Sequence, residues 1–320
     1  MSADMTAPSL LTPDNSSGPA ATSRRDRKRG RIRHLTTADK IIIGLMIGIP
    51  TLVELVLVWF PAVASIILSF ARWNGVGSLS SIEWIGLTNY RNIFSIDPNF
   101  WPALEHNLIW LLFLAFIATP LGILLAVMLD RELAGSKILQ SIFFLPVMLS
   151  LALVGVIWQL MFSPENGFIN GVFGSDVDWF GNSSINLWAA LVAASWKHIG
   201  YIMILYLAGL KGVDPALKEA AAIDGATATQ TFFRVVFPAM RPINIVIVVI
   251  TVIEALRAFD IVWIINKGTN GLQLLSTLIV TNMGAAGRVG YSSALAVILL
   301  VVALVPIIAY LSQAFKEEAR

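Results

Sequence analysis

Residues 213–242 read VDPALKEAAAIDGATATQTFFRVVFPAMRP, a stretch of mixed polarity between two strongly apolar blocks. The pair Asp214-Pro215 is a helix-start signal, because Asp can cap free N–H groups and proline at the first helical position loses no hydrogen bond. We therefore predict a short helix over Pro215–Ile223. Asp224-Gly225 then breaks it, since glycine readily adopts the left-handed conformation at a helix end.

A second short helix is predicted from about Thr227 to Val236, stopping before Pro238, and Pro242 can begin the following apolar helix. The first helix carries Glu219 beside three consecutive alanines, which permit close approach by another surface. Two short helices at a fixed angle would form a rigid protrusion. An ordinary connector between two membrane spans is the alternative for a loop of this length.

The composition is that of an integral membrane protein. Of 320 residues, 57% are hydrophobic and 13% charged, and the mean hydropathy is +0.76, whereas soluble domains are about 25% charged. The sequence has no cysteine and three scattered histidines, so it offers no disulfide, no cysteine nucleophile and no HxxxH or HExxH metal motif. It also lacks the GxxxxGK[ST] loop that cradles ATP phosphates.

The apolar residues gather in six blocks, each long enough to cross about 30 Å of hydrocarbon as a helix. The blocks are about Ile41–Phe70, Leu108–Leu129, Ile138–Met161, Ile185–Leu210, Ile243–Ile265 and Tyr291–Leu311. The first contains Pro50, Glu54 and Pro61, and we expect it to insert with a kink at a proline. The sequence thus predicts an all-α integral membrane protein with six transmembrane helices.

The distribution of basic residues predicts the orientation. Of 22 Lys and Arg residues, 16 lie in the N-terminal tail with Lys40, in loops 130–137 and 211–242 and at the C-terminus, against 4 in the opposite loops. This bias places both termini and residues 213–242 in the cytoplasm. The predicted divisions are a disordered basic tail (1–39), a transmembrane domain (40–315) with the loop 213–242, and a C-terminus (316–320).

The basic run RRDRKRGRIRH at 24–34 is interpreted as a topogenic signal that also contacts anionic lipid. Nucleic-acid binding is disfavoured, because no aromatic residues are interleaved with the basic ones. Outside the membrane, a short amphipathic helix is predicted near Asn89–Phe94, with Trp73, Trp84 and Trp101 at interfacial positions. The Gly/Asn/Ser-rich loop 162–184 is either a surface for an extracytoplasmic partner or a plain connector.

The joint pattern EAAAIDGA at 219–226 and PAMRP at 238–242 resembles the EAA loop of the membrane permeases of ATP-driven, binding-protein-dependent importers. Further segments are similar to the carbohydrate-uptake branch, which includes the maltose and multiple-sugar permeases. These are GLTNYRNIF at 86–94, SWKHIGYIMILYLAGLKGVDP at 195–215, FDIVW at 259–263 and GYSSALAVILL at 290–300. The resemblance covers roughly residues 40–315 and implies the type I ABC importer permease fold. Residues 267–270, KGTN, depart from the Gly-rich turn ending in proline of many relatives.

The resemblance implies a non-catalytic subunit that forms half of the pathway for a sugar or oligosaccharide and sits in the inner membrane of a prokaryote. Its implied partners are a second, related permease, a cytoplasmic ATPase dimer that binds the ATP and Mg²⁺, and an extracytoplasmic solute-binding protein. This chain would hold no cofactor itself. The coupling residues implied by the motif are Glu219, Ala220, Ala221, Asp224, Gly225 and Pro238.

Three charged residues, Glu254, Arg257 and Asp260, lie three apart in the predicted span 243–265, so they share one face of a helix. Inside a membrane they must pair, face a water-filled cavity or approach an interface. An ion pair such as Glu254 with Arg257 is one interpretation and a lining of the translocation path is the other. Sugars are held by polar groups beside aromatic faces, which adds six candidate path residues. These are Asn107, Trp158, Gln159, Trp196, Tyr201 and Asn282.

Two rival functions fit less well. A membrane enzyme would use Glu254 and Asp260 as an acid–base pair or His198 as a base, but the sequence lacks a nucleophile motif, a metal cluster and a cofactor loop. A transporter of glycerol phosphate or another polyol would favour a cationic path for an anionic cargo, and the three charges are of mixed sign.

Overall fold

The computed structural model describes residues 36–130, 135–284 and 287–318. The predicted basic run at 24–34, most of the predicted tail and the last two residues lie outside this part. Contacts divide the chain into two compact units, Met1–Leu55 and Val56–Arg320. The first unit contributes helix α1, Thr37–Glu54, which starts at a capping box. There the Thr36 hydroxyl accepts from the Asp39 N–H at 3.2 Å, and the Asp39 carboxylate accepts from the Thr36 N–H at 3.0 Å.

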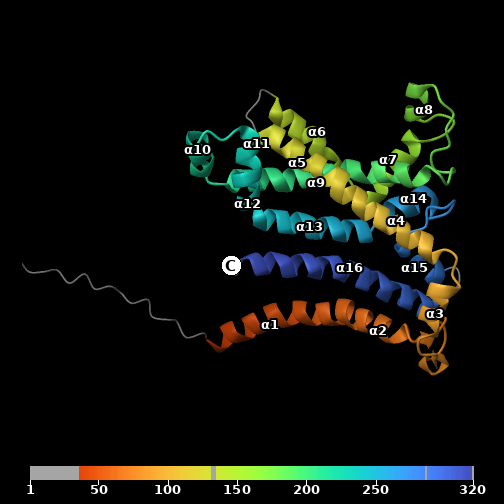
Figure 1. Cartoon of the computed structure of the whole chain (residues 1–320). Coiled ribbons are helices and arrows are strands. Elements are labelled where there is room, and N and C mark those ends of the chain that lie inside the picture. Colours follow the sequence, from red (N-terminus) through yellow and green to blue (C-terminus); the bar gives the residue numbers. More distant parts are fainter. Residues whose placement is uncertain (1–35, 131–134, 285–286, 319–320) are drawn as a thin grey trace, which may run out of the picture. The chain divides into compact units, whose positions relative to one another are not determined.

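The second unit consists of helices and one two-stranded antiparallel sheet. Its elements are α2 (Phe60–Leu68), β1 (Ala71–Arg72), β2 (Glu83–Trp84), α3 (Thr88–Ser95), α4 (Phe100–Phe113), α5 (Thr119–Asp130), α6 (Ser136–Met148), α7 (Leu151–Met161), α8 (Phe168–Phe173), α9 (Asn186–Gly212), α10 (Pro215–Ile223), α11 (Ala228–Thr231), α12 (Phe237–Ala239), α13 (Arg241–Leu256), α14 (Asp260–Asn266), α15 (Leu275–Gly284) and α16 (Val289–Glu318). Within this unit α10, α11 and α12 lie at one end and α3, α8 and α15 at the other (Figure 1). The predicted loops 211–242 and 162–184, which contain α10 to α12 and α8, are therefore at opposite ends of this unit.

Helix α9 packs at the centre of the second unit, against α5, α6 and α13. Glycines permit the closest contacts. A Cβ on Gly122 of α5 would lie 2.8 Å from the carbonyl oxygen of Ile199 in α9, and a Cβ on Gly200 of α9 would overlap the carbonyl oxygen of Phe143 in α6. Because protein interiors are close-packed, only glycine allows these backbones to approach so closely.

Four helical stretches are long and apolar enough to cross a membrane, and they coincide with four of the six predicted blocks. They are Thr37–Leu68, Phe100–Asp130, Asn186–Gly212 and Val289–Ser312. The predicted block 138–161 is not one straight helix, since α6 and α7 meet at an angle of 104°. Leu149 is extended there, and the hydroxyl of Ser150 caps α7 by accepting from the Leu153 N–H at 3.2 Å. With this bent pair counted as one span, the number rises to five.

The predicted span 243–265 is not one continuous helix, and it is not among the stretches that are long and apolar enough to cross a membrane. Helix α13 ends at Leu256 and α14 begins at Asp260, so the charged triplet does not lie on one helix face. At 16 residues, α13 is about 24 Å long, shorter than the roughly 30 Å of a hydrocarbon core. Phe259, with φ −140° and ψ −58°, sits between the two helices and breaks the hydrogen-bond ladder.

Three prolines each follow a π-helical turn by two residues. The turns are Leu55–Trp59, Leu114–Ala118 and Phe232–Val236, before Pro61, Pro120 and Pro238. In the last two turns, the residue directly before the proline donates its N–H to the carbonyl five residues earlier. In an α-helix the proline ring would clash with the carbonyl four residues back, and the wider turn relieves this clash. The helices therefore continue through these prolines.

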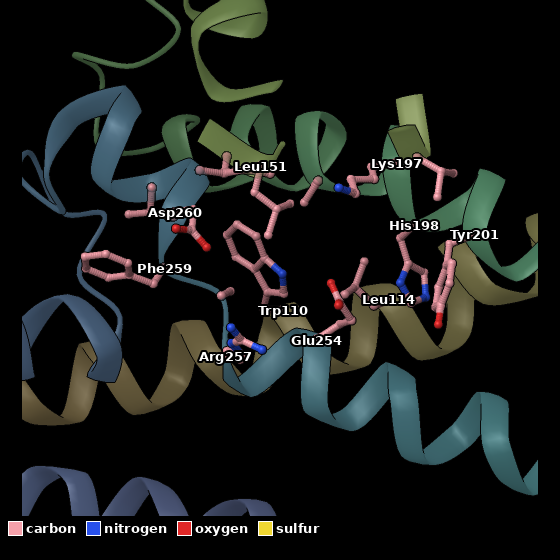
Figure 2. Close-up of a pocket in the computed structure, with 15 residues that line it drawn as sticks. Trp110, Leu114, Leu151, Lys197, His198, Tyr201, Glu254, Arg257, Phe259 and Asp260 are labelled. Carbon is pink, nitrogen blue, oxygen red and sulfur yellow. The ribbon is translucent and has the colours of Figure 1, made fainter. Parts of the chain in front are cut away.

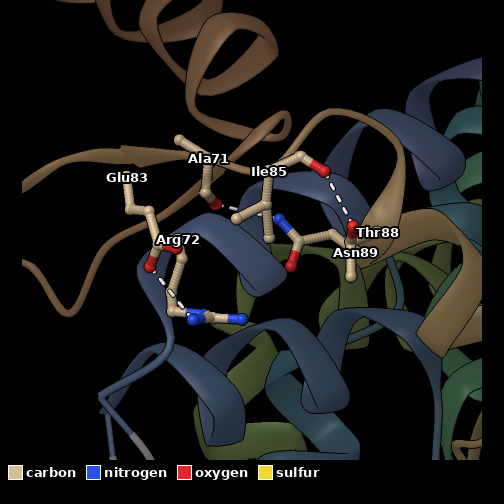
Figure 3. Close-up of polar contacts among 6 residues, drawn as sticks. All are labelled: Ala71, Arg72, Glu83, Ile85, Thr88 and Asn89. Carbon is tan, nitrogen blue, oxygen red and sulfur yellow. Dashed lines mark hydrogen bonds and ion pairs between the residues drawn. The ribbon is translucent and has the colours of Figure 1, made fainter.

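The end opposite α10 is built around Asn89 of α3, whose side chain is 5% exposed. Its amide donates to the carbonyl oxygens of Ser69 and Ala71, both at 2.9 Å, and so joins α3 to the strand pair. In Figure 3 this contact lies beside the exposed Arg72–Glu83 ion pair, 3.0 Å long. The short helix predicted near Asn89–Phe94 is confirmed as α3. The loop 162–184, by contrast, contains the helix α8, which sequence composition did not indicate.

Candidate functional site

The first candidate site is the protrusion formed by α10, α11 and α12. Helix α10 begins and ends at the predicted residues, and the Asp214 carboxylate caps it by accepting from the Ala216 N–H at 2.9 Å. Gly225 follows with φ +76°, a left-handed conformation that is unfavourable for residues with a Cβ atom. Thr227 and Gln230 then form a capping box that starts α11. The two-helix form predicted for this stretch is thus confirmed.

The predicted end of the second helix at Val236 was wrong. The chain stays helical through Pro238 to Ala239, because the π turn over Phe232–Val236 makes room for the proline ring. Pro242 lies in the first turn of α13, as predicted. The protrusion thus has two arms, α10 and the helical segment Ala228–Ala239. The second arm is longer than the sequence indicated, and α13 follows it after one residue.

A groove of about 620 Å³ lies between the two arms of the protrusion. It is lined by Leu217, Ala220, Ala221, Asp224, Gly225, Ala226, Gln230, Arg234 and Val235. Glu219 and Pro238 are exposed but are not among the residues that line this groove. An ion pair of 3.5 Å between Lys218 and Asp130 links α10 to the end of α5. This ion pair is thus a contact between the protrusion and α5.

The second candidate site is a cavity of about 330 Å³ among the apolar helices. Figure 2 shows the residues that line it, which come from α4 and the π turn after it, the α6–α7 break, α9, and the α13–α14 break. They are Trp110, Leu114, Val147, Leu151, Ala194, Lys197, His198, Tyr201, Glu254, Arg257, Ala258, Phe259, Asp260, Ile261 and Val262. Both helix breaks that hydropathy concealed thus contribute to this cavity.

The charges around the cavity are arranged by the helix ends. Arg257 caps the C-terminus of α13 and Asp260 begins α14, so the dipole of each helix favours the charge at its end. Glu254 and Arg257, which both belong to the described residues, form no ion pair with each other, since no nitrogen of Arg257 lies within 4.0 Å of a carboxylate oxygen of Glu254. The ion pair that was one interpretation of their spacing is therefore absent. Both are exposed, as a wet cavity requires.

Lys197 stabilises the α6–α7 break beside the cavity. Its ammonium group donates to the carbonyl oxygen of Leu149 at 2.6 Å. Leu149 caps the C-terminus of α6, where carbonyl groups have no partner within the helix. A cation also suits the negative end of a helix dipole. Lys197 thus satisfies the backbone of a bend that α6 and α7 make within an otherwise apolar segment.

The structure brings Tyr201, Glu254, Arg257 and Asp260 together in this cavity, while the other five predicted path residues lie elsewhere. Asn107 is fully buried and accepts from the Leu275 N–H at 2.9 Å, and Gln159 donates to the Ile265 carbonyl at 3.3 Å. The rings of Trp158 and Trp196 pack against each other with centroids 5.9 Å apart. Asn282 lines a separate pocket of about 830 Å³ near β1 and α3.

Sequence reasoning did not assign Trp110, Lys197 or His198 to the cavity. A signal existed for Lys197, since a cation in an apolar helix needs a partner. Trp110 carried no such signal, because only the packing of α4 on its neighbours places it there. Among the described residues, no group of three or more His, Cys, Asp and Glu side chains is placed to hold a metal ion.

The model of the binding-protein-dependent transport system inner membrane component family matches residues 118–316. A xylose/arabinose import permease of Haloferax volcanii is 31% identical over 90% of this chain and 92% of its own length. An sn-glycerol-3-phosphate transport permease of Brucella suis biovar 1 is 29% identical over 85% and 94%.

The fold is similar to that of a chain in the crystal structure of a bacterial ABC transporter that imports the acidic polysaccharide alginate. The TM-score is 0.75 at 23% identity, and the match covers 87% of this chain and 96% of that one. A chain of the bacterial alginate transporter in complex with its alginate pentasaccharide-bound periplasmic protein gives a TM-score of 0.72 at the same identity, over 85% and 92%.

Proposed function

The chain belongs to the family of binding-protein-dependent transport system inner membrane components, and we propose that it forms half of the translocation pathway of an ATP-driven importer for a sugar or oligosaccharide. The match of the family model over residues 118–316 supports the transporter class. The relative that imports xylose and arabinose supports a carbohydrate cargo. The chain is a non-catalytic membrane subunit, as its relatives are named permeases.

The observation that carries the proposal is the cavity of charged and aromatic side chains within a strongly apolar chain. Glu254 and Asp260 accept hydrogen bonds, Lys197 and Arg257 donate them, and these groups suit the hydroxyls of a sugar. The two acids and two cations balance, which favours an uncharged cargo over glycerol phosphate. The charges lie around a cavity within this one chain, and a second, related permease would supply the other half of the pathway.

The protrusion of α10 to α12 is proposed to dock into a cytoplasmic ATPase subunit. Its exposed Glu219 would pair with a basic group of the ATPase, and the groove beside Ala220 and Ala221 would take a side chain of that subunit. Closure of the ATPase dimer around ATP and Mg²⁺ would then move this arm and, through Lys218–Asp130, helix α5. In this proposal both termini are cytoplasmic, the membrane is the inner membrane of a prokaryote, and a solute-binding protein docks at the opposite end.

The proposal is tested by alanine substitution of Glu254, Arg257 and Asp260, one at a time, in the assembled complex. We expect ATP-dependent uptake of the transported sugar to fall at least tenfold, while the amount of complex recovered from the membrane stays near that of the unmodified protein. The panel of labelled cargoes is xylose, arabinose, an arabino-oligosaccharide, glycerol 3-phosphate and an alginate oligosaccharide.

Glu105→Ala serves as the matched control, because Glu105 is an exposed acid on α4 that lines neither the cavity nor the groove, and its side chain makes no hydrogen bond or ion pair among the described residues. Loss of uptake in proportion to loss of assembled complex would contradict a pathway role and indicate that the three charges act on folding. Preferential uptake of glycerol 3-phosphate would favour the anionic cargo instead.

A further inference from the structure

A chain of hydrogen bonds crosses three helices at the wall of the cavity. The Nε2 atom of His198 in α9 lies 3.0 Å from the hydroxyl of Thr119 in α5, which lies 3.2 Å from the hydroxyl of Thr251 in α13. Thr251 donates in turn to the carbonyl oxygen of Ile247 at 2.8 Å. The three side chains are 5%, 8% and 3% exposed, so water does not compete for these contacts.

The number of protons available fixes their direction. Three contacts need three protons, and the two threonine hydroxyls hold one each. The Ile247 carbonyl can only accept, so it takes the proton of Thr251, and Thr251 can then only accept from Thr119. Thr119 has no proton left for the ring, so the third proton must come from Nε2 of His198. If Thr119 donated to the ring instead, Thr251 would have one proton for two contacts. Either its contact with Thr119 or its contact with the Ile247 carbonyl would then lack a proton.

We propose that Thr119 and Thr251 are positioning residues that hold His198 in the neutral tautomer with its proton on Nε2. The second ring nitrogen, Nδ1, is buried and has no hydrogen-bond partner in the structure. A doubly protonated ring would add a buried charge and an unpaired donor, both of which are unfavourable. In the neutral tautomer Nδ1 carries no proton, so only one acceptor is left unpaired inside the protein.

This assignment fixes the charge that the histidine ring brings to the wall of the cavity. His198 lines the cavity next to Tyr201, as Figure 2 shows, and in this tautomer its ring is uncharged. Because Nδ1 is itself buried, a molecule in the cavity does not reach that atom and meets only the neutral ring. A neutral ring adds no attraction for an anionic cargo. This consequence for the cargo rests on the proposed function, but the tautomer itself does not depend on it.

The tautomer can be measured by ¹⁵N NMR of the histidine-labelled complex in lipid nanodiscs, because a ring nitrogen that carries hydrogen resonates far from one that does not. Subtracting the spectrum of His198→Gln isolates the signals of His198. We expect a protonated Nε2 and an unprotonated Nδ1. Thr251→Ser keeps the hydroxyl and should leave this pattern unchanged.

Thr251→Val removes the hydroxyl at nearly constant shape, and Thr119 can then give its proton to Nε2. With the proton on Nδ1, that N–H is the one group of the pair left without a partner. With the proton on Nε2, both Nδ1 and the hydroxyl proton of Thr119 are left without one. We therefore expect the Nδ1 tautomer to be more populated than the Nε2 tautomer in this variant. A wild-type spectrum with a protonated Nδ1 would overturn the proposal, as would a Thr251→Val spectrum identical to that of Thr251→Ser. The wild-type measurement alone tests the tautomer if the valine variant does not assemble, and neither measurement requires transport.

Discussion

Replacement of Glu219 by arginine should separate this chain from its ATPase without unfolding it. Glu219 is exposed on α10 and makes no hydrogen bond or ion pair among the described residues. Surface substitutions of this kind usually change the free energy of unfolding by no more than about 0.5 kcal/mol. The effect should therefore appear in the association with the ATPase rather than in the stability of the chain.

The size of the effect follows from the proposed ion pair. Removing one partner of a buried, hydrogen-bonded charge pair at an interface costs about 2–5 kcal/mol, and each 1.4 kcal/mol changes Kd about tenfold. The Kd of the ATPase for the membrane subunit should thus rise roughly 30-fold or more. Arginine adds repulsion from the basic group that glutamate would face, so Glu219→Arg should raise the Kd more than Glu219→Gln does.

The assay is binding of the purified ATPase subunit to the membrane subunits in nanodiscs, together with ATP-dependent uptake. Glu165→Arg is the control, since it makes the same change at an exposed position in the loop between α7 and α8, outside the protrusion. We expect wild-type binding for the control and a loss of binding and of uptake for Glu219→Arg. Binding of Glu219→Arg within threefold of wild type would refute the docking role of this residue.

Two further predictions concern the core. Gly200→Ala should lower the free energy of unfolding by about 1–3 kcal/mol, because its Cβ overlaps the Phe143 carbonyl, whereas Gly212→Ala in the same helix has no atom within 4 Å and should be neutral or slightly stabilising. Thermal unfolding followed by size-exclusion chromatography distinguishes them, and equal effects would contradict the α6–α9 packing. Lys197→Met should lower stability by about 1.5–3 kcal/mol, since it removes a charged hydrogen bond to the Leu149 carbonyl. An unchanged unfolding temperature would show that this bond does not hold the α6–α7 bend.

Local signals predicted the protrusion well. Asp214-Pro215, Gly225 and Thr227 act within one or two turns of the chain, and the helix ends that they set were found where expected. Pro238 was misread because a π turn changes the hydrogen-bond register without any change in hydropathy. Four apolar blocks were likewise predicted correctly, since burying them in lipid requires only length and composition.

The helix breaks and the cavity were harder to predict. Hydropathy summed over a block conceals a break such as Leu149-Ser150, although Ser150 carried a capping signal. The charges of Glu254 and Asp260 pointed to a polar site, but their helix assignment required knowing that α13 stops at Leu256. Trp110 reaches the same cavity from a helix far away in the sequence, which is a result of tertiary packing that no local pattern contains.

Reconstitution of the assembled complex in proteoliposomes tests the central claim most directly. With ATP supplied on the side of α10 and the sugar-loaded binding protein on the other side, we expect the labelled sugar to accumulate. We expect no accumulation when the ATPase subunits are omitted or ATP is replaced by a non-hydrolysable analogue. Accumulation without the ATPase, or chemical conversion of the sugar by this chain alone, would contradict the assignment of this chain as the membrane half of an ATP-driven importer.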